Sequence, residues 1–173
     1  IFAREQGIRV HDINMGIGTH VAIEKGLVWP GSTFVSTDSH ANIMGAIGAF
    51  GQGMGDADIA GAFAHGSVWF EVPPSVRLIF DGTPDPECTA KDLTLAACGQ
   101  LGAKGLLGCA AEVSGEVIDR LGVEDRITLA SMATEMGAIT LLIPPSGDVI
   151  SFCRERTTAS FEPIFADAGA SYI

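Results

Sequence analysis

Three side chains that can transfer protons or bind metals follow one another at Asp38, Ser39 and His40. They come directly after the apolar run 33–37, which we interpret as a strand, and before a glycine-rich stretch that we interpret as a helix. In open α/β folds the carboxyl ends of strands form the crevice in which ligands bind, and a following helix offers unpaired N–H groups to an anion. These three residues are therefore the first candidates for a site. The structural alternative is that Asp38 or Ser39 only caps the helix, with His40 beside it.

His20 and Glu135 are two further candidates. His20 lies in a glycine-flanked run that we interpret as a loop able to reach the strand end, where a carboxylate such as Asp38 would fix its tautomer. Glu135 follows Ser131 by four residues in a helical pattern, so that both side chains face the same way. A carboxylate held among apolar residues is suited to proton transfer. The structural alternatives are an exposed turn histidine and a solvated helix face.

Five glycines follow the Asp-Ser-His run and allow the backbone to approach a ligand or a neighbouring element closely. Their spacing matches neither G-x-x-x-x-G-K-[ST] nor G-x-G-x-x-G, which disfavours nucleotide binding. We interpret Gly45 and Gly48 as positions of close packing. The five residues are Gly45, Gly48, Gly51, Gly53 and Gly55.

Composition excludes several classes of protein. The hydrophobic content of 47% in 173 residues indicates a buried core and excludes a disordered chain. The net charge of −11 leaves no basic face for nucleic acid or an anionic membrane. Because no apolar run reaches bilayer length, we expect a cytoplasmic protein. The four cysteines form no C-x-x-C pair, so we expect no closed metal site and interpret them as buried thiols in a reducing compartment. These cysteines are Cys88, Cys98, Cys109 and Cys153.

The elements that must position the candidates alternate between strands and helices, which predicts an α/β fold: a three-layer α/β/α domain with a mixed or parallel sheet. We expect one partial domain over residues 1–173, cut from a longer protein, because the first residues read as the end of a helix. The predicted strands are 33–37, 76–81, 110–113 and 139–143, and the predicted helices are 41–51, 56–69, 91–101, 117–121, 123–137 and 146–156.

Together the motifs resemble the large subunit of the aconitase and isopropylmalate dehydratase family, which includes homoaconitases and related hydro-lyases. The Asp38-Ser39-His40 motif and its glycine-rich continuation carry the resemblance together with several other segments in the family's order. These are Phe2-Ala-Arg-Glu-Gln-Gly, Glu24-Lys-Gly-Leu-Val-Trp-Pro-Gly, Trp69-Phe-Glu-Val-Pro-Pro, Ala90-Lys-Asp and Met132-Ala-Thr-Glu-Met-Gly-Ala. The segments at Glu24 and Trp69 are more similar to the isopropylmalate-type branch.

This resemblance implies a reversible dehydration of a 2-hydroxy di- or tricarboxylic acid at a [4Fe–4S] cluster. By position, Asp38 and His20 are similar to the family's Asp–His pair at the leaving hydroxyl, and Ser39 and His40 to residues that line the site. Glu135 is similar to the active-site glutamate. The resemblance places Ser131 in the cluster surround, the cysteine ligands beyond Ile173 and a small swivelling domain or subunit as partner.

The chain departs from the family's pattern at three places. Ala41 replaces the usual threonine after Asp-Ser-His, Ser131 replaces the usual asparagine, and the usual His-Gln pair reads His20-Val21. Two other readings therefore stay open. One is a non-catalytic binding or assembly module of the same fold, and the other is a hydrolase in which His20, Asp38 and His40 hold one metal ion.

Overall fold

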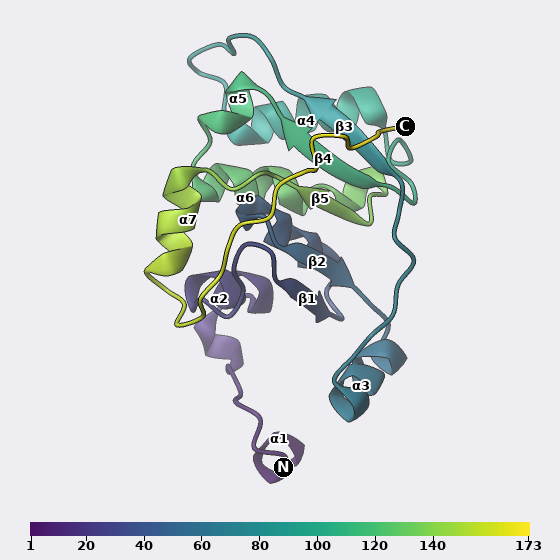
Figure 1. Ribbon diagram of the computed structural model, residues 1–173, viewed down its shortest axis with the longest axis vertical. Coiled ribbons are helices and arrows are strands. Elements are labelled where there is room, and N and C mark those ends of the chain that lie inside the picture. The colour runs from purple at the N-terminus through teal and green to yellow at the C-terminus, as the bar shows by residue number, and fades with distance from the viewer.

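Parallel strands form two small sheets at the centre of the protein (Figure 1). The structure is a computed structural model that describes residues 1–173. The first sheet pairs β1 with β2, and the second has the strand order β3-β4-β5. All pairings are parallel, which confirms the predicted α/β class. The strands are β1 (Thr33–Ser36), β2 (Phe50–Gly53), β3 (Ser75–Ile79), β4 (Ala110–Ser114) and β5 (Thr140–Leu142).

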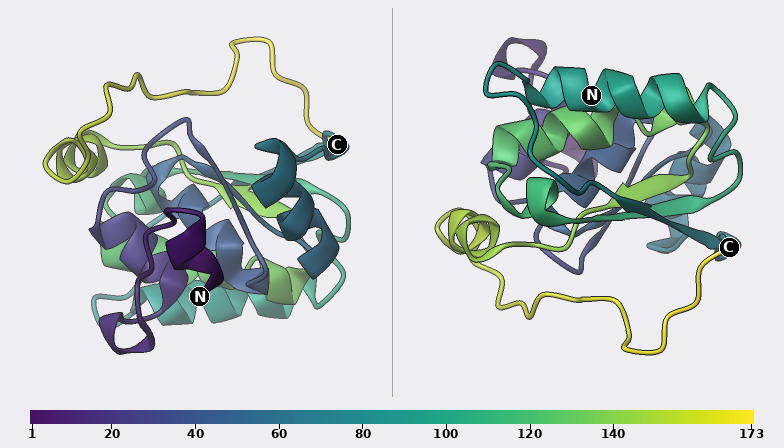
Figure 2. Two further views of the ribbon diagram at one scale, coloured as in Figure 1. Left: turned by 90° about the horizontal axis from the view of Figure 1, so that it is seen from below. Right: turned by 90° about the horizontal axis from the view of Figure 1, so that it is seen from above.

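Helices pack on both sides of these strands. Figure 2 shows α4 and α6 stacked on one face of the three-stranded sheet, with α7 and the extended chain that follows it on the other side. None of the helices is long and apolar enough to cross a membrane. The helices are α1 (Phe2–Glu5), η1 (Ile13–Met15), α2 (Gly18–Glu24), η2 (Ser39–Ile47), α3 (Asp56–His65), α4 (Ala90–Leu101), α5 (Glu116–Asp119), α6 (Val123–Ser131), η3 (Thr134–Met136) and α7 (Gly147–Arg154).

The 3-10 helix η2 lies between two hydrophobic cores. Its Ala46 belongs to the core that α4 and α6 form with β4 and β5. Its Ile43, Met44 and Ile47 belong to the other core, which also contains side chains of α2 and α7. Residues 41–47 are all buried, so the segment that carries His40 at its start is held from both sides.

The predicted helix 41–51 is wrong in its second half. η2 ends at Ile47, because Gly48 adopts a left-handed conformation with φ of 74°. The chain then turns into β2, which pairs with β1 in the register Thr33 to Phe50. Glycines at alternate positions of β2 hid the strand from its hydrophobic pattern.

Three other segments differ from the sequence prediction. The predicted helix 56–69 ends at His65, because Gly66 adopts a left-handed conformation with φ of 68°. The predicted helix 123–137 stops at Ser131, and the chain turns before η3, so that the hydroxyl of Thr134 reaches the backbone carbonyl of Ser39 at 2.7 Å. The run around His20, which we predicted as a loop, is the helix α2 with Val21, Ala22 and Ile23 buried.

A buried arginine fixes the start of α6. Arg126 is 1% exposed and donates hydrogen bonds to the carbonyls of Leu121, Pro144 and Ile118 at 2.9, 2.8 and 3.2 Å. No carboxylate forms an ion pair with it, and burial lowers the pKa of its guanidinium. One side chain therefore joins α5, α6 and the turn after β5, and α6 leads directly to the segment that carries Glu135.

The closest backbone approach in this part of the fold is between η2 and β5. A Cβ atom on Gly45 would lie 1.5 Å from the carbonyl oxygen of Leu141. We predict that Gly45→Ala lowers the free energy of unfolding by about 3 kcal/mol or more, because backbone must move to admit the methyl group. Urea unfolding measures the change.

The matched control is Gly99→Ala, since Gly99 lies inside α4 with nothing within 4 Å of the added Cβ. This control should raise the free energy of unfolding by about 0.5–1 kcal/mol, because alanine is the better helix former. Equal unfolding curves for both variants would show that η2 does not depend on the close approach.

Candidate active site

The sequence at the end of β1 sets the local geometry of the candidate residues. Asp38 is the N-cap of η2, and its Oδ1 accepts a hydrogen bond from the backbone N–H of His40 at 2.9 Å. The backbone N–H of Asp38 donates to the hydroxyl of Ser36 at 3.2 Å. The capping role that we considered as an alternative is thus real. It also holds the carboxylate of Asp38 beside the ring of His40.

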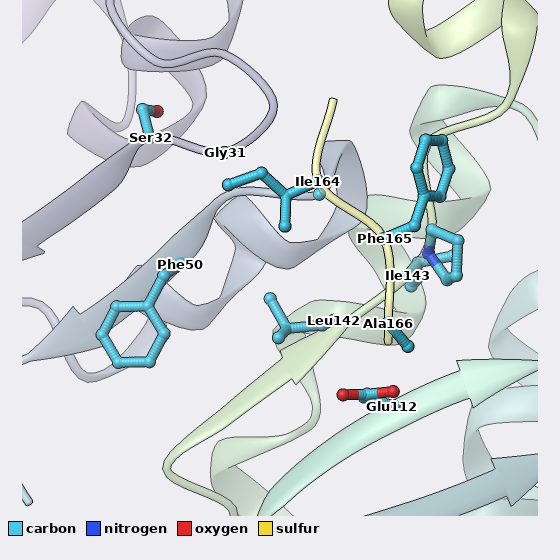
Figure 3. A pocket seen from close by; sticks show the side chains of 11 residues that line it. Gly31, Ser32, Phe50, Glu112, Leu142, Ile143, Ile164, Phe165 and Ala166 are labelled. Carbon is cyan, nitrogen blue, oxygen red and sulfur yellow. The ribbon is translucent and has the colours of Figure 1, made fainter. Parts of the chain in front are cut away.

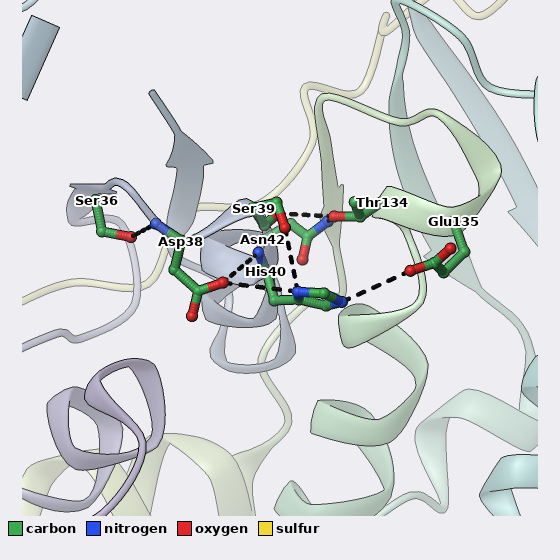
Figure 4. A network of polar contacts seen from close by, with 7 residues as sticks. All are labelled: Ser36, Asp38, Ser39, His40, Asn42, Thr134 and Glu135. Carbon is green, nitrogen blue, oxygen red and sulfur yellow. Dashed lines mark hydrogen bonds and ion pairs between the residues drawn. The ribbon is translucent and has the colours of Figure 1, made fainter. Parts of the chain in front are cut away.

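The imidazole of His40 lies between two carboxylates (Figure 4). Its Nδ1 is 3.6 Å from Oδ1 of Asp38, and its Nε2 is 3.8 Å from Oε1 of Glu135. The hydroxyl of Ser39 lies 3.3 Å from Nδ1. The structure therefore brings together four of the residues that the sequence singled out, from two segments far apart in the chain.

This arrangement is open to solvent. The side chains of Asp38, His40 and Glu135 are 41%, 44% and 57% exposed. The prediction that Glu135 lies among apolar side chains is therefore wrong, because it sits on the short turn η3 rather than on the inner face of a helix. An exposed ion pair contributes only about 0–1 kcal/mol to stability, so folding does not require the pairing of His40 with Glu135.

A polar bridge anchored on the buried Asn42 holds the two segments together. Nδ2 of Asn42, a residue only 1% exposed, donates to the hydroxyl of Thr134 at 2.7 Å. That hydroxyl in turn donates to the carbonyl of Ser39 at 2.7 Å. The two residues of the second hydrogen bond are each adjacent in sequence to a candidate residue, Ser39 to His40 and Thr134 to Glu135.

Sequence reasoning missed Asn42 and Thr134. Asn42 is a polar residue inside the apolar run 41–47, and such a residue is buried only with hydrogen-bond partners. The sequence therefore indicates that Asn42 has a hydrogen-bond partner, but it cannot show which residue this is, because Thr134 is 92 residues away.

His20 does not join the network around His40. It lies on α2 and lines a separate pocket of about 600 Å³ that also contains Lys25, Glu124 and Arg156. No hydrogen bond or ion pair links it to Asp38, so its assignment as the partner of Asp38 stays a prediction. Its Nδ1 is buried without a hydrogen-bond partner.

Ser131 also remains a prediction as part of a cluster surround. It ends α6, and its hydroxyl donates to the carbonyl of Thr128 at 2.9 Å, which turns it towards its own helix.

The four cysteines do not supply a cluster site. They are free thiols on separate parts of the fold, and no group of three or more His, Cys, Asp or Glu side chains is arranged to hold a metal ion. Burial raises the pKa of Cys98, as does the nearby charge of Glu135, and burial raises the pKa of Cys153 to about 11.

The structure also gives no geometric support to the reading as a hydrolase with one metal ion. That reading required His20, Asp38 and His40 around one ion, but His20 lies in the other pocket.

The expectation of four buried cysteines is only partly correct, since Cys153 alone is buried.

Another pocket, of about 220 Å³, lies between the strands and the C-terminal segment (Figure 3). Its walls are mostly apolar, with Phe50, Leu142 and Ile164 among them. Its one ionisable side chain, Glu112, accepts a hydrogen bond from the hydroxyl of Tyr172 at 2.5 Å, which raises the pKa of the tyrosine. Glu112 is thus engaged with Tyr172, and no imidazole or second carboxylate lines this pocket beside it.

The chain is a parallel α/β domain that holds an imidazole between two carboxylates at a strand end. The model of the aconitase family (aconitate hydratase) matches residues 2–170. The chain therefore belongs to the aconitase family, which confirms the resemblance seen in its motifs.

The relatives carry two names. The chain is 42% identical to the "probable methanogen homoaconitase large subunit" of Methanosarcina mazei, over 99% of this chain and 44% of the relative. It is 40% identical to the "3-isopropylmalate dehydratase large subunit 1" of Pyrococcus furiosus and 37% identical to the "3-isopropylmalate dehydratase large subunit" of Halothermothrix orenii, in each case over 99% of this chain and 41% of the relative. The chain thus spans less than half the length of these relatives.

We predict that substitutions of Asp38 separate its capping role from its charge. Asp38→Ala should lower the free energy of unfolding by about 1 kcal/mol, whereas Asp38→Asn should change it little, because asparagine caps equally well. Thermal or urea unfolding of the 173-residue chain measures both.

The control is Asp12→Ala. Asp12 makes the same kind of cap, with Oδ1 2.7 Å from the N–H of Ile13, but the turn that it caps buries no residue. Its removal should leave the unfolding curve unchanged. A loss for Asp38→Asn as large as that for Asp38→Ala would show that the negative charge, and not the cap, stabilises this segment.

Proposed function

We propose that the full-length protein is a hydro-lyase that removes water from a 2-hydroxy di- or tricarboxylic acid such as isopropylmalate, with His40, Asp38 and Glu135 in its active site. The observation that supports this most strongly is the position of His40 between two carboxylates at the end of a parallel strand. The aconitase-family match and the names of the relatives support the class of reaction.

The chemistry follows from the arrangement of these groups. In dehydration a base takes a proton from carbon, the C–H electron pair becomes the new double bond, and the hydroxyl leaves with a second proton as water. We assign that second proton to His40, because an imidazole can donate a proton and its ring nitrogens lie 3.6 and 3.8 Å from the carboxylates of Asp38 and Glu135. The carboxylate of Asp38 accepts a hydrogen bond from the backbone N–H of His40 and so stays beside the imidazole ring, which it can orient.

The remaining parts of the site lie outside these residues in our proposal. A [4Fe–4S] cluster, when bound, would polarise the departing hydroxyl, and its thiolate ligands would come from the rest of the full-length protein. A multiply anionic substrate requires cations, whereas this chain has a net charge of −11. Arginines from the rest of the protein and a small subunit, which the "large subunit" names of the relatives indicate, would complete the carboxylate sites.

We predict that Glu135→Gln in the full-length protein, assembled with its small subunit, lowers kcat for dehydration by about 100-fold or more. The amide keeps the size of the side chain but loses the negative charge that faces Nε2 of His40. Turnover of isopropylmalate, of a homocitrate-type acid and of citrate is measured, with iron and acid-labile sulfide content determined for every sample.

Glu116→Gln is the matched control. Glu116 is 73% exposed on α5 and forms a comparable surface ion pair with Arg120 at 3.7 Å. It should retain wild-type turnover. If the wild-type protein turns over none of the three acids, the proposed function is wrong. If Glu135→Gln remains fully active with unchanged iron and sulfide, Glu135 has no role in the reaction.

A further inference from the structure

Glu135 lies in the middle of the three-residue turn η3, between two anchored neighbours. Its carboxylate makes a single ion-pair contact, with Nε2 of His40 at 3.8 Å. At that distance, with the Glu135 side chain 57% exposed, this contact is too weak to hold the carboxylate in one place. The position of the carboxylate therefore depends on the residues that come directly before and after Glu135.

The residue after Glu135 is anchored in the apolar core. Met136 is fully buried in the core that α4 and α6 form with β4 and β5. Its carbonyl also accepts a hydrogen bond from the backbone N–H of Leu106 at 3.0 Å. Because these contacts do not involve the hydroxyl of Thr134, we expect this end of η3 to stay in place when that hydroxyl is removed.

The residue before Glu135 is Thr134, which is anchored to the segment that carries His40 (Figure 4). The hydroxyl of Thr134 accepts a hydrogen bond from Nδ2 of Asn42 and donates its one hydrogen to the carbonyl of Ser39, both at 2.7 Å. The direction of the pair is fixed, because an amide nitrogen can only donate and a carbonyl can only accept. A hydroxyl, which does both, satisfies the two partners at once.

We propose that Thr134 is a positioning residue for the dehydration and that Asn42 supports it. The hydroxyl of Thr134 holds η3 against the start of η2, so that the carboxylate of Glu135 stays opposite Nε2 of His40. This inference rests on the proposed function, and in it both residues act through Glu135 without touching the substrate. Because proton transfer depends steeply on the placement of the reacting groups, loss of the hydroxyl lowers turnover more than it lowers substrate binding.

The test is a double-mutant cycle in the full-length protein, assembled with its small subunit. Thr134→Val, which keeps the shape of the side chain without its hydroxyl, is combined with Glu135→Gln. The kcat and KM for isopropylmalate are measured for the wild type, both single variants and the double variant. Thr134→Ser restores the hydroxyl. The matched control is Thr128→Val, since the hydroxyl of Thr128 donates to the carbonyl of Glu124 within its own helix at 3.0 Å.

We expect Thr134→Val to lower kcat about tenfold or more while KM changes less than about threefold, and Thr134→Ser to keep most of the wild-type kcat. In the Glu135→Gln background, Thr134→Val should lower kcat by less than about twofold, because no charge is left to position. Thr128→Val should match the wild type. Thermal unfolding and the content of iron and acid-labile sulfide are measured for every variant.

An equal loss of kcat for Thr134→Val in both backgrounds overturns the inference, because the hydroxyl would then act independently of Glu135. An unchanged kcat in Thr134→Val overturns it too. If Thr134→Val does not fold, the same cycle with Asn42→Ala decides, since this change removes one donor and leaves the bond from Thr134 to Ser39. Failure of the proposed function is distinguishable: a wild-type protein that turns over none of the acids refutes the hydro-lyase, whereas an active wild type with independent losses refutes the positioning role alone.

Discussion

The candidate site depends on one polar bridge, in which the buried Asn42 donates to Thr134 and Thr134 donates to the carbonyl of Ser39. The two ends of the second bond are 95 residues apart in the chain. The bridge therefore holds the segment that carries His40 beside the segment that carries Glu135. Both of those side chains are about half exposed, so their own attraction would not hold them together.

The rest of the fold supports this bridge from two directions. On one side η2 is packed between two cores and approaches β5 at Gly45, where no side chain could fit. On the other side Arg126 ties α6 to α5 and to the turn after β5 through three carbonyls. The apolar cores thus hold η2, which begins beside His40, and the buried guanidinium holds α6, which leads to Glu135. The exposed acid–base groups lie where these two segments meet.

The class of fold could be predicted from the sequence, because apolar runs alternate with helical patterns, and an apolar run before Asp38-Ser39-His40 correctly indicated that these residues follow a strand. The strand β2 could not, since alternating glycines removed the hydrophobic pattern that marks a strand. The break after Ser131 escaped prediction for another reason: the hydrogen bond of Thr134 to Ser39 is tertiary, and helical periodicity does not report it. The proximity of the His40 ring to Glu135 is likewise tertiary and could not be predicted from helical periodicity, whereas the assignment of His20 as the partner of Asp38 stays a prediction.

The central claim is that His40 and Glu135 act as one unit. A double-mutant cycle in the full-length protein, with His40→Gln, Glu135→Gln and both together, tests it through kcat/KM for dehydration of isopropylmalate. If the two groups form one acid–base unit, the double variant should be no slower than the slower single variant, because the first substitution already removes what the second one supports. Losses that multiply in the double variant would contradict the account, since they would show two residues acting independently.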